Sequence, residues 1–263
     1  MSLPELPPSF YWTEASCGLV LRCRPLDAVA PHVFTTRRLA LASDAAWRRV
    51  GEAVGSAHVA TLTQAHGGRV VILRRGLPMA ASRPEADVLV SNNPEVAVAV
   101  RAADCLPLLL GDARTGTVAA AHAGWRGTAA GAARAAVEAM MSEFGVAPGH
   151  LVAAIGPGIR PCCYEVGREL PDAFAAAGHA RHLIDRWFPS RESSLRLDLQ
   201  QANRHQLTAA GVPDAQIHDC GLCTAMHLDV LTSYRAEREG AGRIAGVIRS
   251  AGGSVRPPGP SPR

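Results

Sequence analysis

Three short segments of the sequence place reactive side chains beside small residues. They contain His66, Cys105 and His122 and read Gln64-Ala65-His66-Gly67-Gly68, Ala103-Asp104-Cys105-Leu106-Pro107 and Ala121-His122-Ala123-Gly124-Trp125-Arg126-Gly127. Two imidazoles and one thiol suit zinc, and three protein ligands leave a fourth tetrahedral position open, as in catalytic zinc sites. The spacing of these residues matches no local zinc signature. A buried thiol beside two hydrogen-bonded turn histidines is therefore the alternative.

The remaining cysteine and glycine motifs are weaker signals. The segment Cys220-Gly221-Leu222-Cys223 is a lone C-x-x-C pattern without a second pair or a thioredoxin-like context. Cys162 and Cys163 are adjacent, which makes an unstrained disulfide between them difficult, so we expect them to be structural. The segment Gly156-Pro157-Gly158 follows an apolar run and fits either an anion cradle or a tight turn.

The basic residues exclude several kinds of chemistry. All 27 residues counted as Lys or Arg are arginine, and the chain has no lysine. A Schiff-base lysine, a pyridoxal-phosphate anchor and a P-loop lysine are therefore impossible. Any bound phosphate or carboxylate must be held by arginine, histidine or backbone N–H groups.

Charge and hydropathy indicate a globular protein that binds neither nucleic acid nor membrane. The net charge is +4 and no basic run stands out. No apolar stretch reaches the roughly 18–20 residues of a membrane span, and the first residues do not resemble a signal peptide. Seven cysteines without a secretion signal favour metal-binding or catalytic thiols over a disulfide framework. We therefore expect a cytoplasmic protein.

The elements that must position the reactive residues are a mixture of strands and helices. Helical patterns cover Gly127–Phe144, which Gly145 ends, and Asp198–Ala210, where Asp198 is placed to cap the N-terminus. Short strand-like apolar runs occupy Val59–Leu62, Val70–Leu73, Val96–Val100, Leu106–Leu110, Thr117–Ala121, Leu151–Ile155 and Gly242–Ile248. Because short turns separate many of these strands, an α+β or mixed α/β sandwich is favoured over a regular βαβ winding.

The chain reads as one domain between two irregular ends. Residues 1–16 contain three prolines and are expected to form a loosely ordered lead-in. Residues 17–249 show no repeat and no break in composition. Residues 250–263 are rich in Gly, Ser and Pro, a composition typical of disorder.

Taken together, the motifs resemble those of the YfiH/DUF152 family, also called the multi-copper polyphenol oxidoreductase or laccase-domain family. The resemblance runs from about Phe34 to Ile248. It is carried, in order, by FTTR (Phe34–Arg37), TQAHG (Thr63–Gly67), ADVLVSN (Ala86–Asn92), ADCLPLLLGD (Ala103–Asp112), AAAHAGWRG (Ala119–Gly127), IGPGIRPCCYEVG (Ile155–Gly167), CT (Cys223-Thr224), SYR (Ser233–Arg235) and GR (Gly242-Arg243).

This resemblance implies a fold and a set of site residues. The fold is a layered α/β/β/α sandwich with two mixed sheets between helices. The family's zinc-binding active-site residues match His66, Cys105 and His122, and the family pattern places Arg37, Arg126 and Arg235 near the pocket. Two departures bear on the pocket rim and on substrate range. The family's glycine-rich segment after Arg37 is replaced by Arg38-Leu39-Ala40-Leu41, and its paired phenylalanines are replaced by Leu231-Thr232.

The function implied by the resemblance is that of a zinc-dependent purine nucleoside phosphorylase, with adenosine deamination as a second activity. Substrates would be adenosine, inosine, guanosine and methylthioadenosine, with phosphate as co-substrate. Deamination would use a water molecule activated by zinc to attack the purine C6. Asp104 is a candidate proton shuttle, or else a turn residue. Phosphorolysis needs an anion site, for which the planar fork of arginine is suited: Arg37, Arg126 and Arg235.

Two other activities remain as alternatives. A laccase-type oxidoreductase follows from the family's older name, but a multicopper site needs more histidines than the two in the matching motifs. An amide hydrolase that edits cell-wall precursors would use Cys105 as nucleophile and His122 as base. Copper is a possible occupant of the metal site because it binds most nitrogen and sulfur ligands more tightly than zinc does. The resemblance also implies a monomer.

Overall fold

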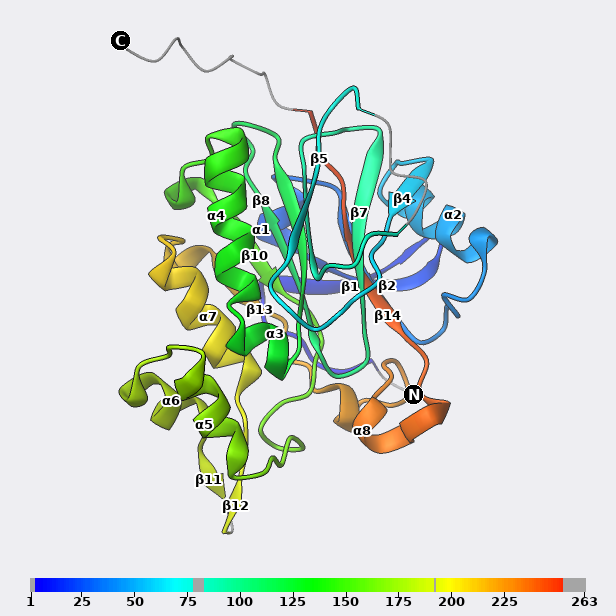
Figure 1. The fold of residues 1–263 in the computed structure, drawn as a ribbon. Helices are drawn as coiled ribbons and strands as arrows, with labels where there is room; N and C mark the ends of the chain where they lie inside the picture. Colours follow the sequence, from blue (N-terminus) through cyan, green and yellow to red (C-terminus); the bar gives the residue numbers. More distant parts are fainter. Residues whose placement is uncertain (1–2, 78–82, 192, 253–263) are drawn as a thin grey trace, which may run out of the picture.

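The computed structural model describes residues 3–77, 83–191 and 193–252. Its centre consists of two six-stranded mixed β-sheets, with helices on the outer face of each (Figure 1). This confirms the predicted mixed α/β fold. None of the helices in the described part of the chain has the length and apolar character needed to cross a membrane.

The first sheet has the strand order β1-β2-β3-β14-β7-β4. The strand β7 pairs antiparallel with β14 and parallel with β4. The bounds of its strands are β1 (Phe10–Ala15), β2 (Gly18–Cys23), β3 (His32–Thr35), β14 (Ile244–Ile248), β7 (Val96–Ala102) and β4 (His58–Ala60).

The second sheet has the strand order β13-β10-β8-β9-β6-β5. The three strands β8, β9 and β6 are consecutive antiparallel neighbours, and each of them contains or directly follows a residue of the site described below. The bounds of its strands are β13 (Ile217–Asp219), β10 (Val152–Ile155), β8 (Leu106–Gly111), β9 (Val118–Ala123), β6 (Val88–Ser91) and β5 (Val70–Leu73). A separate two-stranded ribbon consists of β11 (Ser190–Arg191) and β12 (Ser194–Leu195).

The helices lie mostly on two sides of the paired sheets (Figure 1). The α2 helix covers the first sheet, whereas α4 and α7 cover the second. The helix bounds are α1 (Arg24–Asp27), α2 (Asp44–Ala53), α3 (Trp125–Ala129), α4 (Ala132–Phe144), α5 (Glu169–Ala176), α6 (Arg181–Trp187), α7 (Leu199–Ala209) and α8 (Tyr234–Glu237).

The alternation of side chains between the two faces of each strand explains why the fold has four layers. In β7, Val98 and Val100 pack into the core between the two sheets, whereas Ala97 and Ala99 face α2. Successive side chains of a strand point to opposite faces of its sheet. Both faces of each sheet are therefore apolar and need a covering layer. The order of layers is helix, sheet, sheet, helix.

Two sequence-based expectations differ from the structure. The expectation that residues 1–16 form a loosely ordered lead-in is wrong for β1. This aromatic-rich strand pairs with β2 over six residue pairs and buries Phe10. The single helix Gly127–Phe144 is two helices, since Gly131 adopts a left-handed conformation with a φ of 77° between α3 and α4. The expected disordered tail from residue 250 lies mostly outside the described residues.

Candidate active site

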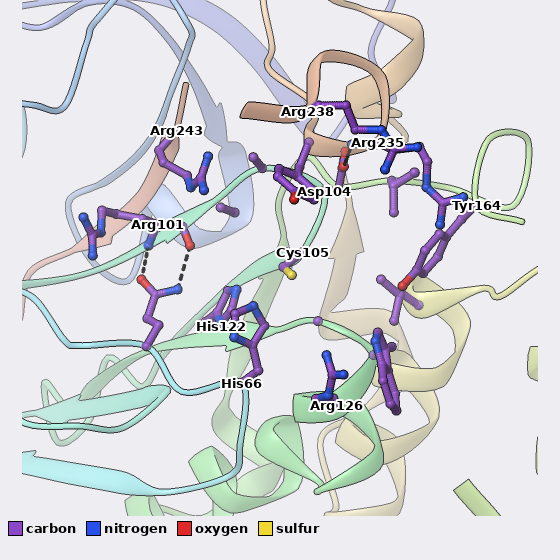
Figure 2. A pocket seen from close by; sticks show the side chains of 18 of the residues that line it. His66, Arg101, Asp104, Cys105, His122, Arg126, Tyr164, Arg235, Arg238 and Arg243 are labelled. Atoms are coloured by element: carbon purple, nitrogen blue, oxygen red, sulfur yellow. Dashed lines mark hydrogen bonds between the residues drawn. The ribbon is translucent and has the colours of Figure 1, made fainter. Parts of the chain in front are cut away.

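A pocket of about 710 Å³ lies where β7, β8 and β9 meet the loops around them. Its walls come from segments far apart in the sequence, including the loop after β4 with His66 and the helix α8 with Arg235. Figure 2 shows His66, Cys105 and His122 grouped together in this pocket. All three predicted metal ligands thus face one cavity.

The pairing of β8 with β9 brings two of these residues together. In this ladder, Leu106 pairs with Ala123 and Pro107 pairs with His122. Cys105 immediately precedes β8 and therefore reaches the sheet edge at which β9 ends. The ligand atoms of His66, Cys105 and His122 all lie within 4.8 Å of one another. The two imidazole rings are 4.9 Å apart and nearly perpendicular, at 74°.

A buried carboxylate, Asp87, supports both histidines. Its Oδ1 accepts a hydrogen bond from Nδ1 of His122 at 2.8 Å and another from the backbone N–H of His66 at 2.9 Å. Its Oδ2 accepts from the backbone N–H of Gly67 at 2.6 Å. Asp87 immediately precedes β6, whose first residue, Val88, pairs with the neighbour of His122 in β9. Sheet register therefore places this carboxylate beside the imidazole.

The sequence analysis did not select Asp87. A signal was present, because the residue lies inside the ADVLVSN segment. A carboxylate that fixes the ring orientation of a ligating histidine is typical of metal sites.

The charges of Cys105, His122 and Asp87 depend on one another. Burial raises the pKa of the Cys105 thiol, but hydrogen bonds and the charges of His122 and His66 outweigh this effect and bring the pKa to about 6. Burial lowers the pKa of His122, but Asp87 and the Cys105 thiolate raise it to about 9. Burial raises the pKa of Asp87, but hydrogen bonds from His122 and Gly67 leave it below the ordinary value. A thiolate is therefore stabilised here.

The residue types present fit a zinc ion. The donors are two imidazoles and a thiol favoured as thiolate, which are the ligands that zinc prefers. Because Asp87 occupies Nδ1 of His122, that ring has Nε2 left for a metal. His66 is exposed to the pocket, so a ligand position toward substrate stays accessible. The three residues would hold the metal and leave one position open.

The backbone around the thiol has two unusual features. A Cβ atom on Gly124 would lie 2.5 Å from Sγ of Cys105, so a larger residue at this position must displace the thiol. His66 and Asp104 both have positive φ values, 62° and 87°. Such conformations are unfavourable for residues other than glycine and cluster at functional sites.

Asp104 lies at the pocket, but both of its carboxylate oxygens have partners. Oδ1 accepts from the Thr224 hydroxyl at 2.6 Å, and Oδ2 accepts from the backbone N–H of Arg235 at 2.6 Å. These contacts connect the turn before Cys105 to the start of α8. Asp104 thus positions the wall that carries Arg235, and its role as a proton shuttle stays a prediction.

Arg126 and Arg235 line the pocket as the sequence predicts. The guanidinium carbon of Arg126 lies 4.3 Å from the ring centre of Trp125, and that of Arg235 lies 5.2 Å from the ring centre of Tyr164. Neither arginine takes part in an ion pair with a described residue. Both cations therefore remain available to bind an anion.

Arg101 and Arg243 also line the pocket and were missed as candidates. In Figure 2 they lie on one side of the three ligands, with Tyr164 and Arg235 on the other. Burial lowers the pKa of Arg101, and repulsion by Arg83 and Arg243 adds to this. Positive charge thus also gathers on this side of the pocket. The GR motif offered a signal for Arg243.

Arg37 is not among the described residues that line the pocket. The sequence predicts it nearby, but its guanidinium donates to the backbone carbonyls of Leu228 and Leu231 and forms a 2.8 Å ion pair with Glu237. These contacts hold α8 and the segment before it. Arg37 therefore fixes the segment that carries the pocket residue Arg235.

Comparisons with known proteins show what the chain is similar to. A family model described as multi-copper polyphenol oxidoreductase laccase matches residues 41–251. A Deinococcus radiodurans protein named purine nucleoside phosphorylase is 39% identical over 202 residues, 76% of this chain and 74% of that protein. A protein named adenosine deaminase RL5, from an unknown prokaryotic organism, is 37% identical over 164 residues, 62% of each chain.

Solved structures show the same architecture. The crystal structure of YlmD from Geobacillus stearothermophilus matches with a TM-score of 0.78 and 28% identity, covering 93% of this chain and 99% of that chain. The family model spans most of the described domain, and the Deinococcus relative extends over three quarters of the chain. The chain therefore belongs to the multi-copper polyphenol oxidoreductase laccase family, the enzyme family of YfiH and YlmD.

Proposed function

We propose that this protein is a zinc-dependent purine nucleoside phosphorylase. The observation that carries the proposal is that one pocket is faced by a His-Cys-His ligand set and by arginines that have no carboxylate partner among the described residues. Its volume of about 710 Å³ lies within the usual range for small-molecule sites, which is roughly 300–1,000 Å³. Relatives named purine nucleoside phosphorylase support the same activity.

In this proposal, Arg126 and Arg235 bind phosphate. Each guanidinium is braced by an aromatic ring, so less side-chain freedom is lost when an anion binds. Arg235 is further fixed through the hydrogen bond from its backbone N–H to Asp104. The Trp125 and Tyr164 rings also line the pocket and offer apolar surface to a purine or a ribose.

The reaction replaces one bond to the ribose by another. An oxygen of phosphate forms a bond to C1′ of the nucleoside while the bond between C1′ and N9 of the purine breaks. The electron pair of that bond passes to the purine, which takes up a proton, and the products are the free base and ribose 1-phosphate. The arginines hold the attacking anion in line with C1′, which is catalysis by positioning.

His66, Cys105 and His122 would hold the zinc ion. When bound, zinc supplies a Lewis acid at neutral pH. Asp87 orients His122 and the loop of His66 toward that position. Because the His66 side chain is exposed, a metal held there would be accessible to a substrate in the pocket.

Adenosine deamination is the second candidate activity, supported by the relative named adenosine deaminase RL5. In this reaction, water adds to C6 of the purine and ammonia leaves, so no phosphate is needed. The amide-hydrolase alternative needs a free Cys105 thiolate, which a bound zinc ion would occupy. The metal content of the purified protein therefore separates the alternatives.

Chromatography of adenosine, inosine and guanosine incubated with the purified protein tests the proposal. The reactions are run with and without phosphate, beside Cys105→Ala and Arg126→Gln variants. Free base and ribose 1-phosphate that form only with phosphate, and not with Cys105→Ala, are the expected result. Inosine formed from adenosine regardless of phosphate would instead establish a deaminase. Three unchanged nucleosides in every reaction would overturn both activities.

A further inference from the structure

A second group of metal-ligating side chains takes no part in the proposed reaction. The sulfur atoms of Cys162, Cys163 and Cys223 all lie within 4.8 Å of one another. Cys162 is exposed, Cys163 is half-buried and Cys223 is buried. The group therefore has one side open to solvent, through which an ion could enter, and one side closed by the core.

Backbone contacts hold these thiols in place. The N–H of Cys163 donates to the carbonyl of Arg160 at 2.9 Å, which closes the turn that carries both adjacent cysteines. An isolated β-bridge joins Gly158 to Cys223 and brings the third thiol to this turn. The Arg160 guanidinium donates to both carboxylate oxygens of Asp219, at 3.0 and 2.9 Å. The three sulfurs are thus brought together before any ion binds.

We propose that Cys162, Cys163 and Cys223 form a binding site for a soft, thiophilic cation of the Cu(I) class. Thiolates select soft cations such as Cu(I). Zinc ordinarily requires four ligands in a structural site, and among the described residues this group supplies three. Three sulfur ligands suffice for Cu(I), and binding releases the thiol protons. No change in oxidation state is involved.

The proposed site differs chemically from the one in the pocket. The pocket group contains two imidazoles and one sulfur, whereas this group contains sulfur alone. The two groups are also separate in the chain, although Tyr164, next to Cys163, lines the pocket. A protein with both metals available would therefore place zinc in the pocket and Cu(I) at the three cysteines.

An anaerobic titration tests this assignment on the whole 263-residue chain loaded with zinc. Cu(I) is added in the presence of a chromophoric Cu(I) chelator, and bound copper and zinc are both counted after gel filtration. The test variant is Cys162→Ser/Cys163→Ser, in which the changed residues are exposed or half-buried. The control is Cys17→Ala, which removes a cysteine in another part of the fold.

The expected result is one Cu(I) ion bound by wild type and by Cys17→Ala with zinc retained, and loss of this copper in the double variant. X-ray absorption of the wild-type copper should show sulfur neighbours alone, a readout that needs no variant. Equal copper uptake by wild type and the double variant would overturn the proposal. So would copper with nitrogen neighbours and released zinc, which would place the ion in the pocket.

Discussion

Nδ1 of His122 lies 2.8 Å from Oδ1 of Asp87, and the same carboxylate accepts hydrogen bonds from the backbone of the loop that carries His66. One buried side chain thus orients one proposed zinc ligand directly and a second through its main chain. The arrangement connects β6, β9 and the loop after β4. Metal affinity should therefore depend on a residue that does not itself touch the metal.

Asp87→Asn should lower the affinity for zinc by about 10–100-fold, the usual effect of removing such a partner. Asparagine replaces one of the two carboxylate oxygens by an amide nitrogen, which cannot accept the hydrogen bonds that this oxygen now receives. Competition with a zinc-responsive dye measures the affinity. The matched control is Asp27→Asn, which alters a carboxylate paired with Arg22 away from the pocket. An equal loss of affinity in both variants would refute a specific role for Asp87.

Gly124→Ala should abolish zinc binding while the protein stays folded. The added Cβ would lie 2.5 Å from Sγ of Cys105 and must push the thiol out of its position. Zinc content by mass spectrometry of metals and circular dichroism check the two parts of this prediction. Gly149→Ala is the control, because a Cβ there meets nothing within 4 Å. Normal zinc content in Gly124→Ala would show that the close contact relaxes without cost to the site.

Arg126→Gln and Arg235→Gln should each raise the KM for phosphate by roughly tenfold or more, since a hydrogen bond to a charged group contributes about 1.5–3 kcal/mol. The KM for nucleoside should change less. Arg74→Gln controls for the loss of a positive charge outside the pocket, where Arg74 pairs with Glu143. If the KM for phosphate rises only in Arg101→Gln, the anion binds on the opposite side of the metal ligands (Figure 2).

Removal of zinc should destabilise the folded protein as well as stop the reaction. A ligand that binds only the native state at 1,000 times its Kd contributes about 4 kcal/mol. Thermal denaturation with and without a chelator measures this contribution, and added zinc should restore both Tm and activity. In Cys105→Ala the chelator should leave the Tm nearly unchanged. A Tm of wild type that is insensitive to chelation would contradict a tightly bound ion.

Stability should fall on acidification between about pH 6.5 and pH 4 because of His32. Burial lowers the pKa of this imidazole to about 4, and its Nε2 accepts a hydrogen bond from the backbone N–H of Cys23. The unfolded chain, with a histidine pKa of about 6.5, binds the proton more readily. Neutral His32 thus makes its full contribution to the free energy of unfolding above pH 6.5. About 3 kcal/mol of this contribution is lost as the pH falls to 4.

Urea denaturation at several pH values measures this loss. His32→Gln keeps a neutral polar side chain but has no group that titrates in this range. The variant should therefore show a smaller decrease in the free energy of unfolding from pH 7 to pH 4.5. Identical pH dependence in the variant and wild type would assign the effect to other groups.

Local sequence patterns predicted only some of the strands around the site: the runs Leu106–Leu110 and Thr117–Ala121 overlap β8 and β9, whereas β6 (Val88–Ser91) was not predicted. The run Val70–Leu73 is β5 as predicted, and Asp198 caps α7 by accepting a hydrogen bond from the N–H of Gln201 at 2.8 Å. These features depend on neighbours in sequence. His66, Cys105 and His122 could be chosen from the sequence because their residue types suit metal chemistry.

The contacts that could not be predicted from the sequence are between segments that lie far apart in the chain. Asp87 supports His122 because β6 lies beside β9, and no periodicity within either strand specifies that neighbour. Arg37 was expected at the pocket, yet it binds carbonyls about 190 positions further along the chain, at Leu228 and Leu231. The second cluster of thiols likewise depends on the bridge between Gly158 and Cys223. Only the folded chain shows these neighbours.

The position of β14 (Ile244–Ile248) in the first sheet has a consequence for synthesis of the protein. This strand lies between β3 and β7, although about 140 residues separate it from β7 in the chain. While the ribosome is still translating the intervening residues, β3 and β7 each present an unpaired apolar edge, which favours aggregation. The nascent chain should therefore depend on chaperone protection until residue 248 has left the exit tunnel.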